Sequence, residues 1–315
     1  MEKQQSENQK QIHKPVLLRE VVEGLEVKDN EILIDLTLGN AGHTKQILES
    51  GVTNLTIIGI DADQIAIDRS EEILEAYKTE NKIYLENTYS DSLEKILDKY
   101  EIENVDKVLF DLGFRSDQVD DPERGFSFRN EGPLDMSFQS AKNIEDRENK
   151  ITASEIVNLW QEESIADIIY GFGEEKFSRR IAKKIVETRE LKDRKIETTT
   201  ELAAIIKSAV PMFYRYGKIH PATKTFQALR IAVNSELERF KTALNISYSR
   251  LSPGGRIAVI SFHSLEDRIV KRFFKEKANT GEARLLTKKP IIPSEEEVKE
   301  NPRSRSSKLR IIEKN

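Results

Sequence analysis

The chain has 315 residues, of which 37% are hydrophobic and 33% are charged, and its formal net charge at pH 7 is −5. This length suits two average domains, or one large α/β domain that carries an insertion. The negative charge excludes a general polycation that coats nucleic acid, so any RNA or DNA site must be a local basic patch. The chain has no cysteine, which excludes disulfides, iron–sulfur clusters, thiolate zinc sites and cysteine nucleophiles.

The chain shows no pattern of a targeting or membrane segment. Residues 1–11 are polar and lack the apolar run of a signal peptide. The longest apolar runs have the length of buried strands, well short of the roughly 18 apolar residues of a membrane span. We therefore expect a soluble, cytoplasmic protein without membrane contacts.

Strand and helix patterns alternate in the first third of the chain. Short apolar runs predict buried strands, and the segments between them predict helices. The predicted strands are 31–36, 55–60, 82–85 and 107–110, and the predicted helices are 43–49, 63–77 and 92–100. Buried strands separated by crossover helices indicate an open, doubly wound α/β sheet with parallel strands.

From about residue 135 to residue 218 the sequence predicts almost only helix and loop. Two capping boxes start helices here, Thr152 with Glu155 and Thr198 with Glu201. In each box the hydroxyl and the carboxyl reciprocally bind free backbone N–H groups. A single long helix is predicted to follow over residues 225–251.

Strand patterns return toward the end of the chain. The predicted strands are 255–262, 284–287 and 308–313. The economical organisation is a discontinuous sheet domain, residues 1–134 and 219–315, interrupted by a helical, substrate-recognising domain, residues 135–218.

A glycine-containing turn follows the first predicted strand, between Asp35 and His43 (DLTLGNAGH). Backbone N–H groups in such a turn can approach an anionic or polar ligand, although a tight turn without a ligand has the same pattern. The glycines lack the spacing of a dinucleotide site. Asp61 ends the second strand, where a carboxylate can accept both ribose hydroxyls of a nucleoside cofactor. A helix N-cap is the alternative role for Asp61.

The segment from Leu251 to Gly255 (LSPGG) leads into the fifth predicted strand. Such a connection is common in class I methyltransferases, which bind S-adenosylmethionine at the sheet end where dehydrogenases bind NAD. Together with the first turn and Asp61, it favours a nucleoside cofactor at the carboxyl ends of the strands.

A further signal follows the fourth strand, from Asp111 to Gln118 (DLGFRSDQ). The exocyclic amine of cytosine or adenine is a poor nucleophile, because its lone pair is delocalised into the ring. Acceptors for its protons, here the Asp111 carboxylate and the Leu112 carbonyl, would help the nitrogen become tetrahedral as a methyl group arrives. Phe114 would stack on a flipped base, with plain core packing as the alternative.

Five longer segments carry a family resemblance. They are DPERGFSF (121–128), GPLDM (132–136), FGEEKF (172–177), HPATKTFQALRIAVN (220–234) and ISFHSLEDRIVK (260–271). In these segments, and from His13 to Ser306 overall, the chain resembles the bacterial small-subunit (16S) rRNA cytosine-N4 methyltransferases, the MraW or RsmH family. The resemblance implies a Rossmann-like class I methyltransferase, monomeric or homodimeric. It would transfer a methyl group from S-adenosylmethionine to N4 of one P-site-region cytidine in 16S rRNA of the small ribosomal subunit.

The resemblance also implies roles for individual residues. Cofactor contacts would come from Ala41, Gly42, His43, Asp61, Tyr89, Asp111 and Gln118. Asp111 and Phe114 would serve the methyl transfer, and His220, Lys224, Asn234, Ser261 and His263 would lie near the target cytidine. The four histidines show no metal-ligand spacing, so we expect no catalytic metal.

Local basic segments are further candidates for RNA contact, although a solvated charged face is the alternative for each. They are residues 176–194, residues 218–224 and a tail with Arg303, Arg305, Lys308 and Arg310. Because the chain is acidic overall, recognition would depend on the shape of a folded ribosomal subunit more than on bulk attraction.

The chain departs from the usual family pattern at positions that matter. Ala41 replaces a glycine of the first turn, and its methyl group would weaken cofactor binding if the position requires positive φ. The loop after the fourth strand has Phe114, Arg115 and Ser116 in place of a small apolar residue and two serines. Lys224 replaces an arginine, which keeps the charge but loses bidentate phosphate recognition.

Two alternative functions remain open at this point. One is an NAD(P)-dependent dehydrogenase, against which the missing dinucleotide motif and the segment 251–255 argue. The other is a non-catalytic RNA-binding or ribosome-assembly homologue whose altered first turn has lost the cofactor.

Overall fold

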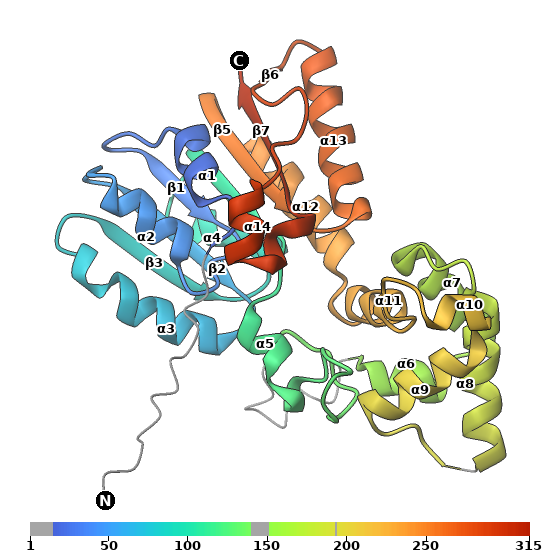
Figure 1. Cartoon of the computed structure of the whole chain (residues 1–315). Helices are drawn as coiled ribbons and strands as arrows, with labels where there is room; N and C mark the ends of the chain where they lie inside the picture. Colours follow the sequence, from blue (N-terminus) through green and yellow to red (C-terminus); the bar gives the residue numbers. More distant parts are fainter. Residues whose placement is uncertain (1–14, 140–150, 193) are drawn as a thin grey trace, which may run out of the picture.

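The computed structural model describes residues 15–139, 151–192 and 194–315, so His13, where the family resemblance begins, lies outside the described residues. Figure 1 shows a twisted sheet with helices on both faces, next to a second group of helices. The strands of the seven-stranded sheet lie in the order β3-β2-β1-β4-β5-β7-β6. Their bounds are β1 (Ile32–Asp35), β2 (Thr56–Asp61), β3 (Lys82–Asn87), β4 (Val105–Asp111), β5 (Leu251–Ser261), β6 (Ala283–Leu285) and β7 (Lys308–Lys314).

Strands β1 to β5 pair in parallel, whereas β7 runs antiparallel to both β5 and β6. Parallel strands need crossover helices, and these cover both faces of the sheet, which is why the central strands are apolar along their whole length. The predicted doubly wound α/β sheet is therefore confirmed, including the two weaker strands near the end of the chain.

The order of the strands brings three acidic side chains to one edge. The order reverses between β1 and β4, and ligands of open α/β sheets bind at such a switch point, beyond the carboxyl ends of the strands. At this edge β1 ends at Asp35, β2 at Asp61 and β4 at Asp111.

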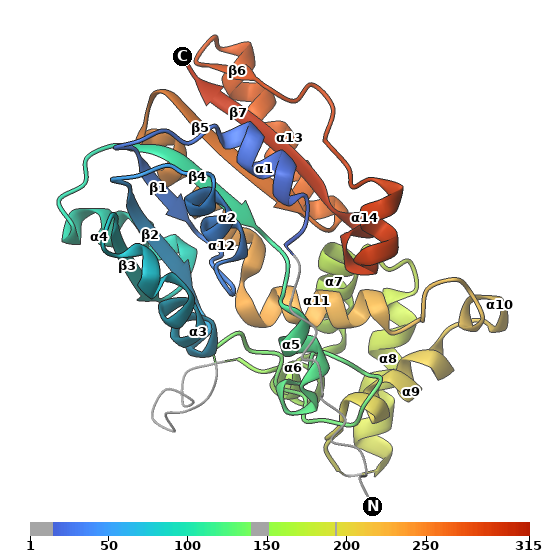
Figure 2. The same ribbon diagram turned by 60° about the vertical axis from the view of Figure 1, so that its left-hand side comes forward.

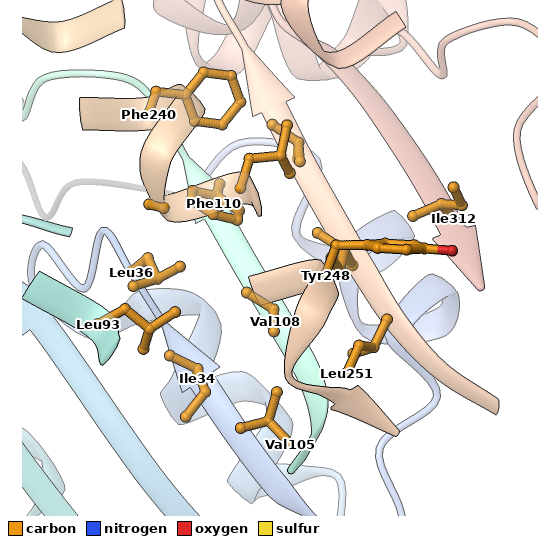
Figure 3. Packing of buried hydrophobic residues seen from close by; sticks show 14 of the residues in the cluster. Ile34, Leu36, Leu93, Val105, Val108, Phe110, Phe240, Tyr248, Leu251 and Ile312 are labelled. Atoms are coloured by element: carbon orange, nitrogen blue, oxygen red, sulfur yellow. The ribbon is translucent and has the colours of Figure 1, made fainter. Parts of the chain in front are cut away.

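Each face of the sheet packs against its own set of helices. One face packs against α1 (Leu18–Leu25), α2 (Gly42–Glu49) and α3 (Gln64–Leu74), and the other against α4 (Leu93–Lys99), α12 (Glu236–Ser249) and α13 (Ser264–Asn279). On the second face Phe110 of β4 lies beside Phe240 of α12, with ring centroids 5.3 Å apart (Figure 3). Burying a side chain as completely as Phe110 stabilises the fold by about 1.5–3 kcal/mol.

A second part of the molecule is helical and has its own apolar core. It consists of α6 (Ala153–Leu159), α7 (Glu162–Gly173), α8 (Ser178–Lys192), α9 (Thr199–Ala209), α10 (Met212–Arg215) and α11 (Thr223–Asn234). Its core extends from Leu134 to Leu229, so the helical packing continues beyond the predicted boundary at residue 218. No helix of the described ranges is long and apolar enough to cross a membrane.

The helix starts predicted from capping residues agree with the structure. Thr152 and Glu155 form a capping box, with the Thr152 N–H donating to the Glu155 carboxylate at 2.7 Å and the Glu155 N–H donating to the Thr152 hydroxyl at 3.2 Å. The hydroxyl of Thr198 likewise accepts the N–H of Glu201 at 3.2 Å. Both helices therefore begin where local hydrogen bonding predicts.

The single helix predicted over 225–251 is wrong, because the chain turns at Ser235. This residue has φ 50°, and it separates α11 from α12. The side chain of Arg239 donates to the carbonyl of Asn234 at 3.1 Å, which satisfies a carbonyl left free by the end of α11. The turn lets α11 join the helical core while α12 packs on the sheet (Figure 2).

The segment Leu251–Gly255 is part of β5, where the sequence predicts a connection. Leu251 pairs with Val105, and the next pair is Arg256 with Lys107, so the intervening residues bulge out of the ladder. This bulge lies at the start of β5, opposite to the strand end at Ser261. The segment therefore shapes the sheet and does not reach the edge that carries the three aspartates.

Candidate functional site

The site begins with the three aspartates at the carboxyl ends of β1, β2 and β4. Asp35 is buried, and Asp61 and Asp111 each expose 17% of their side chains. Burial raises the pKa of Asp35 to about 6 and that of Asp111 to about 7, and it also raises the pKa of Asp61. Three carboxyl groups in a low-dielectric site favour a ligand that brings positive charge or hydrogen-bond donors.

The turn between β1 and α2 contacts the carboxylate of Asp61. Gly39 has φ 56°, and its N–H donates to one Asp61 carboxylate oxygen at 2.9 Å. Ala41 also has positive φ, at 55°, so alanine stands in a left-handed conformation that glycine adopts more readily. Its methyl group is fully buried in the apolar core beneath α1 and α2, not in the polar site. Any effect of Ala41 on a ligand therefore acts through the backbone.

Gly42 and His43 connect this turn to the start of the described chain. A Cβ on Gly42 would lie 2.3 Å from Cγ of Pro15, so only glycine fits here. His43 Nε2 lies 2.9 Å from the carbonyl oxygen of Val16, which can only accept, so Nε2 carries the proton. Its Nδ1 lies 3.8 Å from the Asp111 carboxylate, and burial lowers the pKa of His43. Both residues therefore hold the first turn against residues 15–16.

Asp61 is not the cap of the following helix. Asp63 fills that role, because its side chain accepts the N–H of Ile65 at 3.1 Å. The second carboxylate oxygen of Asp61 accepts the N–H of Asp63 at 2.8 Å. Asp61 is thereby held at the strand end, partly open to solvent, as a ribose-binding carboxylate would be.

Asp63 is a buried acidic residue at this edge that sequence reasoning missed. Its buried carboxylate accepts hydrogen bonds from Arg115 at 2.8 Å, Gln118 at 3.1 Å and Arg124 at 2.9 Å. Burial alone would raise the pKa of Asp63, but the two guanidinium groups bring it below the usual value. Gln118, expected to contact the cofactor, donates its amide to this cluster and so ties the loop after β4 to the loop after β2. The sequence signal for this cluster was an arginine in each of two motifs, Arg115 in the segment 111–118 and Arg124 in the segment 121–128.

Two aromatic side chains lie near this edge with arginines on their rings. Phe114 is 41% exposed, which contradicts plain core packing, and the Arg230 guanidinium lies 4.6 Å from its ring centroid. The Arg239 guanidinium lies 3.8 Å from the ring centroid of Tyr89, and burial raises the pKa of the Tyr89 hydroxyl. An exposed ring with a planar cation over it can hold a base by stacking.

Three side chains that could ligate a metal meet beside Asp111. The ligand atoms of Glu236, His263 and Glu266 all lie within 4.8 Å of one another, although the histidine spacing in the sequence does not indicate this. Glu236 accepts two hydrogen bonds from Arg230, at 2.8 and 2.9 Å. Glu266 accepts the N–H of His263 at 3.2 Å and completes a capping box at the start of α13. Both carboxylates thus already have protein partners, and the negative charge of Glu266 adds to the burial that raises the pKa of Asp111.

Several residues expected to contact RNA have structural partners. The Asn234 amide donates to the carbonyls of Met136 and Arg230, and its oxygen accepts the N–H of Phe138. Both amide hydrogens of this buried side chain are therefore bonded within the protein. The Lys224 ammonium donates to the carbonyl of Glu174 at 2.9 Å, at the end of α7.

The remaining expected RNA contacts differ in how available they are. His220 is exposed and its ring stacks on Phe128, with centroids 4.6 Å apart. Ser261 is buried, and its hydroxyl lies 3.4 Å from the carbonyl oxygen of Lys308. Arg303 pairs with Asp120 of α5 (Ser116–Asp120) at 2.9 Å, whereas Arg305 points to an open cavity.

The edge with the three aspartates fits a nucleoside cofactor with an amino-acid tail. Two buried oxygens at this edge, Oδ1 of Asn40 and Oδ1 of Asp111, have no hydrogen-bond partner among the described residues. Native proteins seldom leave buried acceptors unpaired, so a donor on a ligand accounts for both. Asp61 offers a partly exposed carboxylate for hydroxyl groups at the neighbouring strand end.

The sheet order, the antiparallel β7 and the acidic switch point define a Rossmann-like class I methyltransferase fold. Comparison with known proteins agrees. The MraW methylase family matches residues 10–315, and the chain belongs to this family of methyltransferases.

Curated relatives cover nearly the whole chain. A ribosomal RNA small subunit methyltransferase H from Trichodesmium erythraeum is 46% identical over 96% of this chain and 99% of the relative. The protein of the same name from Nostoc punctiforme is 47% identical over 96% of this chain and 94% of the relative. Among solved structures, an rRNA methylase from Streptococcus thermophilus is 11% identical, with a TM-score of 0.41 over 94% of this chain and 93% of that chain.

Proposed function

We propose that the protein methylates the exocyclic N4 of a cytidine in the P-site region of 16S rRNA, using S-adenosylmethionine and the small ribosomal subunit as substrate. The observation that carries this proposal is Asp111. Its carboxyl group lies at the end of β4, beside the first turn, and one buried oxygen has no hydrogen-bond partner among the described residues. The exposed ring of Phe114 follows three residues further on. The names of the relatives support small-subunit rRNA as the substrate class.

The first turn and the end of β2 would hold the cofactor. Asp61 would accept hydroxyl hydrogens, and Asn40 would accept a donor of the amino-acid tail. S-adenosylmethionine supplies an electrophilic methyl group on a sulfonium centre, and the acidic edge of the sheet suits that positive charge. The hydrogen bonds of the Asp63 cluster tie the loops after β2 and β4 to each other. They would therefore keep the cofactor and the base at a constant distance from each other.

Asp111 would act on the amino group of the base. Its free oxygen would accept an N4–H hydrogen bond and help the nitrogen lone pair leave conjugation with the ring. With a pKa of about 7, the carboxyl group is partly ionised at neutral pH and can take the proton that the nitrogen loses on methylation. Phe114, with Arg230 on its ring, would stack against the base.

The first test is nucleoside mass spectrometry after incubation of purified protein with S-adenosylmethionine and unmethylated small subunits. We expect N4-methylcytidine to appear in the digested rRNA. Asp111→Ala should lower turnover about 10²–10⁴-fold, because it removes the acceptor for the amine proton, while subunit binding stays within about twofold. Equal losses in turnover and in binding would contradict the role of Asp111, and another methylated nucleoside would contradict the proposed base.

The positive φ of Ala41 favours one alternative, a non-catalytic homologue with a weakened cofactor site. Thermal unfolding with and without S-adenosylhomocysteine separates the two functions, because a ligand that binds only the folded protein raises its melting temperature. Since the Ala41 methyl lies in the apolar core, we expect the wild-type protein to be stabilised by this ligand. No stabilisation in the wild type, with recovery in Ala41→Gly, would support the non-catalytic homologue.

A further inference from the structure

A cavity of about 360 Å³ lies beside the proposed base pocket. It opens between the start of α13 and the tail that leads into β7, next to α14 (Glu295–Glu300). Its wall includes Phe262, whose ring packs so closely on Gly113 that a Cβ there would lie 2.8 Å from it. Gly113 lies between Asp111, the last residue of β4, and Phe114. The cavity is therefore a direct neighbour of the site where the target base would lie.

Part of the cavity lining is apolar. Phe262, Ile292 and Val298 line it, and Ile292 is 65% exposed despite its large aliphatic side chain. An exposed apolar wall with an aromatic ring can cover the flat face of a base or a ribose.

Two basic side chains also line the cavity, Arg305 and Lys308, and no carboxylate of the described residues does. The Lys308 ammonium pairs with the Asp267 carboxylate next to the cavity at 3.4 Å, so Arg305 supplies most of its positive charge. The Arg305 side chain is exposed and forms no ion pair with the described residues, unlike Arg303 in the same 3₁₀ turn (Pro302–Ser306), which Asp120 neutralises at 2.9 Å. Arg305 thus directs an uncompensated, planar cation at the cavity.

A buried hydroxyl also lacks a partner here. Ser307 is 1% exposed and lines the cavity, and its Oγ has no hydrogen-bond partner among the described residues. A buried hydroxyl without a partner is costly, so a ligand oxygen at this point accounts for it. The cavity also includes Ser264, the first residue of the 16-residue helix α13, whose N-terminus favours negative charge.

We propose that this cavity binds one nucleotide of the rRNA strand that flanks the target cytidine. Its phosphate would contact Arg305, Lys308 and the Ser307 hydroxyl, and its base or ribose would lie on Phe262 and Ile292. The inference rests on the proposed rRNA substrate and adds a second nucleotide subsite to it. A splayed single strand next to the target suits such a subsite, because one nucleotide held firmly helps to keep its neighbour out of the stack.

The test compares Arg305→Ala and Ser307→Ala with Arg272→Ala, an exposed arginine of α13 that does not line the cavity. We expect Arg305→Ala to raise the KM for small subunits about tenfold, as the loss of a charge-assisted hydrogen bond does. It should also reduce the slope of log binding constant against log salt concentration by about 0.7, the value for one phosphate contact on a single strand. Ser307→Ala should raise the KM a few-fold without changing that slope, and Arg272→Ala should change neither.

All variants should keep the thermal stabilisation by S-adenosylhomocysteine, which shows that fold and cofactor site are intact. A photoreactive benzoylphenylalanine in place of Ile292 should crosslink to 16S rRNA within the small subunit. An unchanged KM and salt slope in Arg305→Ala, or a crosslink to a ribosomal protein, would overturn the inference while wild-type methylation still supports the proposed function. Absence of methylation and of subunit binding by the wild type would overturn both.

Discussion

At the scale of single residues, Asp111 combines two properties that its environment sets. Burial raises its pKa to about 7, and one of its oxygens lacks a partner among the described residues. The negative charge of the nearby Glu266 adds to this burial, so the carboxyl group is costly to ionise.

This pKa predicts the pH dependence of methylation. Only the ionised carboxylate can accept the proton of the amine, so kcat/KM should rise as pH increases through about 7 and level off above it. A pH–rate profile with subunits as the varied substrate measures this. Asp111→Asn should lose both most of the activity and this limb of the profile. A profile that falls as pH rises through this range would contradict the assignment of Asp111 as acceptor.

At the scale of elements, the turn at Ser235 joins the two parts of the molecule. It separates α11, which packs in the helical core, from α12, which packs on the sheet. Asn234 at the end of α11 holds the loop before residue 140 through Met136 and Phe138, while Arg230 and Glu236 pair across the turn at 2.8 Å. The turn is therefore held in place by contacts on both of its sides.

Asn234→Ala should destabilise the fold more than it weakens RNA binding. The substitution leaves the Met136 carbonyl and the Phe138 N–H without their partner, and each unsatisfied buried group costs about 1–3 kcal/mol. We expect the free energy of unfolding in urea to fall by about 2–4 kcal/mol. Asn245→Ala, at an exposed position of α12, is the control and should change it by less than about 0.5 kcal/mol. A stable Asn234→Ala protein with a raised KM for subunits would instead favour direct RNA contact.

At the scale of the whole molecule, a second contact joins the helical part to the sheet part. Glu174, just after α7, accepts hydrogen bonds from Ser264 and Arg268 of α13, the latter at 2.6 Å. Figures 1 and 2 show α11 between the sheet and the other helices, and Arg230 of α11 lies on the ring of Phe114 in the loop after β4. Movement between the parts would therefore change the aromatic surface that we propose to stack on the base.

The Glu174 contact should add little to stability. Both side chains of the Glu174–Arg268 pair are about half exposed, at 43% and 46%, and exposed ion pairs contribute about 0–1 kcal/mol. A double-mutant cycle with Glu174→Ala and Arg268→Ala should give a coupling energy within that range in urea unfolding. A coupling above about 2 kcal/mol would mean that this pair, and not the turn at Ser235, holds the two parts together.

The sequence by itself determined the sheet and much of the chain's character. Apolar runs predict strands, because burial on both faces of a parallel sheet demands them, and the Thr152–Glu155 box predicts a helix start, because its hydrogen bonds are local. The aspartates at the ends of β2 and β4 follow from the same pattern. These features depend on neighbours in the chain, which a single sequence displays directly.

Tertiary structure alone decided which polar residues are engaged and which are free. The Asp63 cluster joins residues up to 61 positions apart, and Asn234 binds backbone 98 positions away. Arg303 and Arg305 look alike in the sequence, yet Asp120, 183 positions from Arg303, neutralises only the first. The helix likewise breaks at Ser235 because the segment before this residue packs in one core and the segment after it packs in another. Such outcomes depend on contacts between distant segments, and those contacts exist only once the chain has folded.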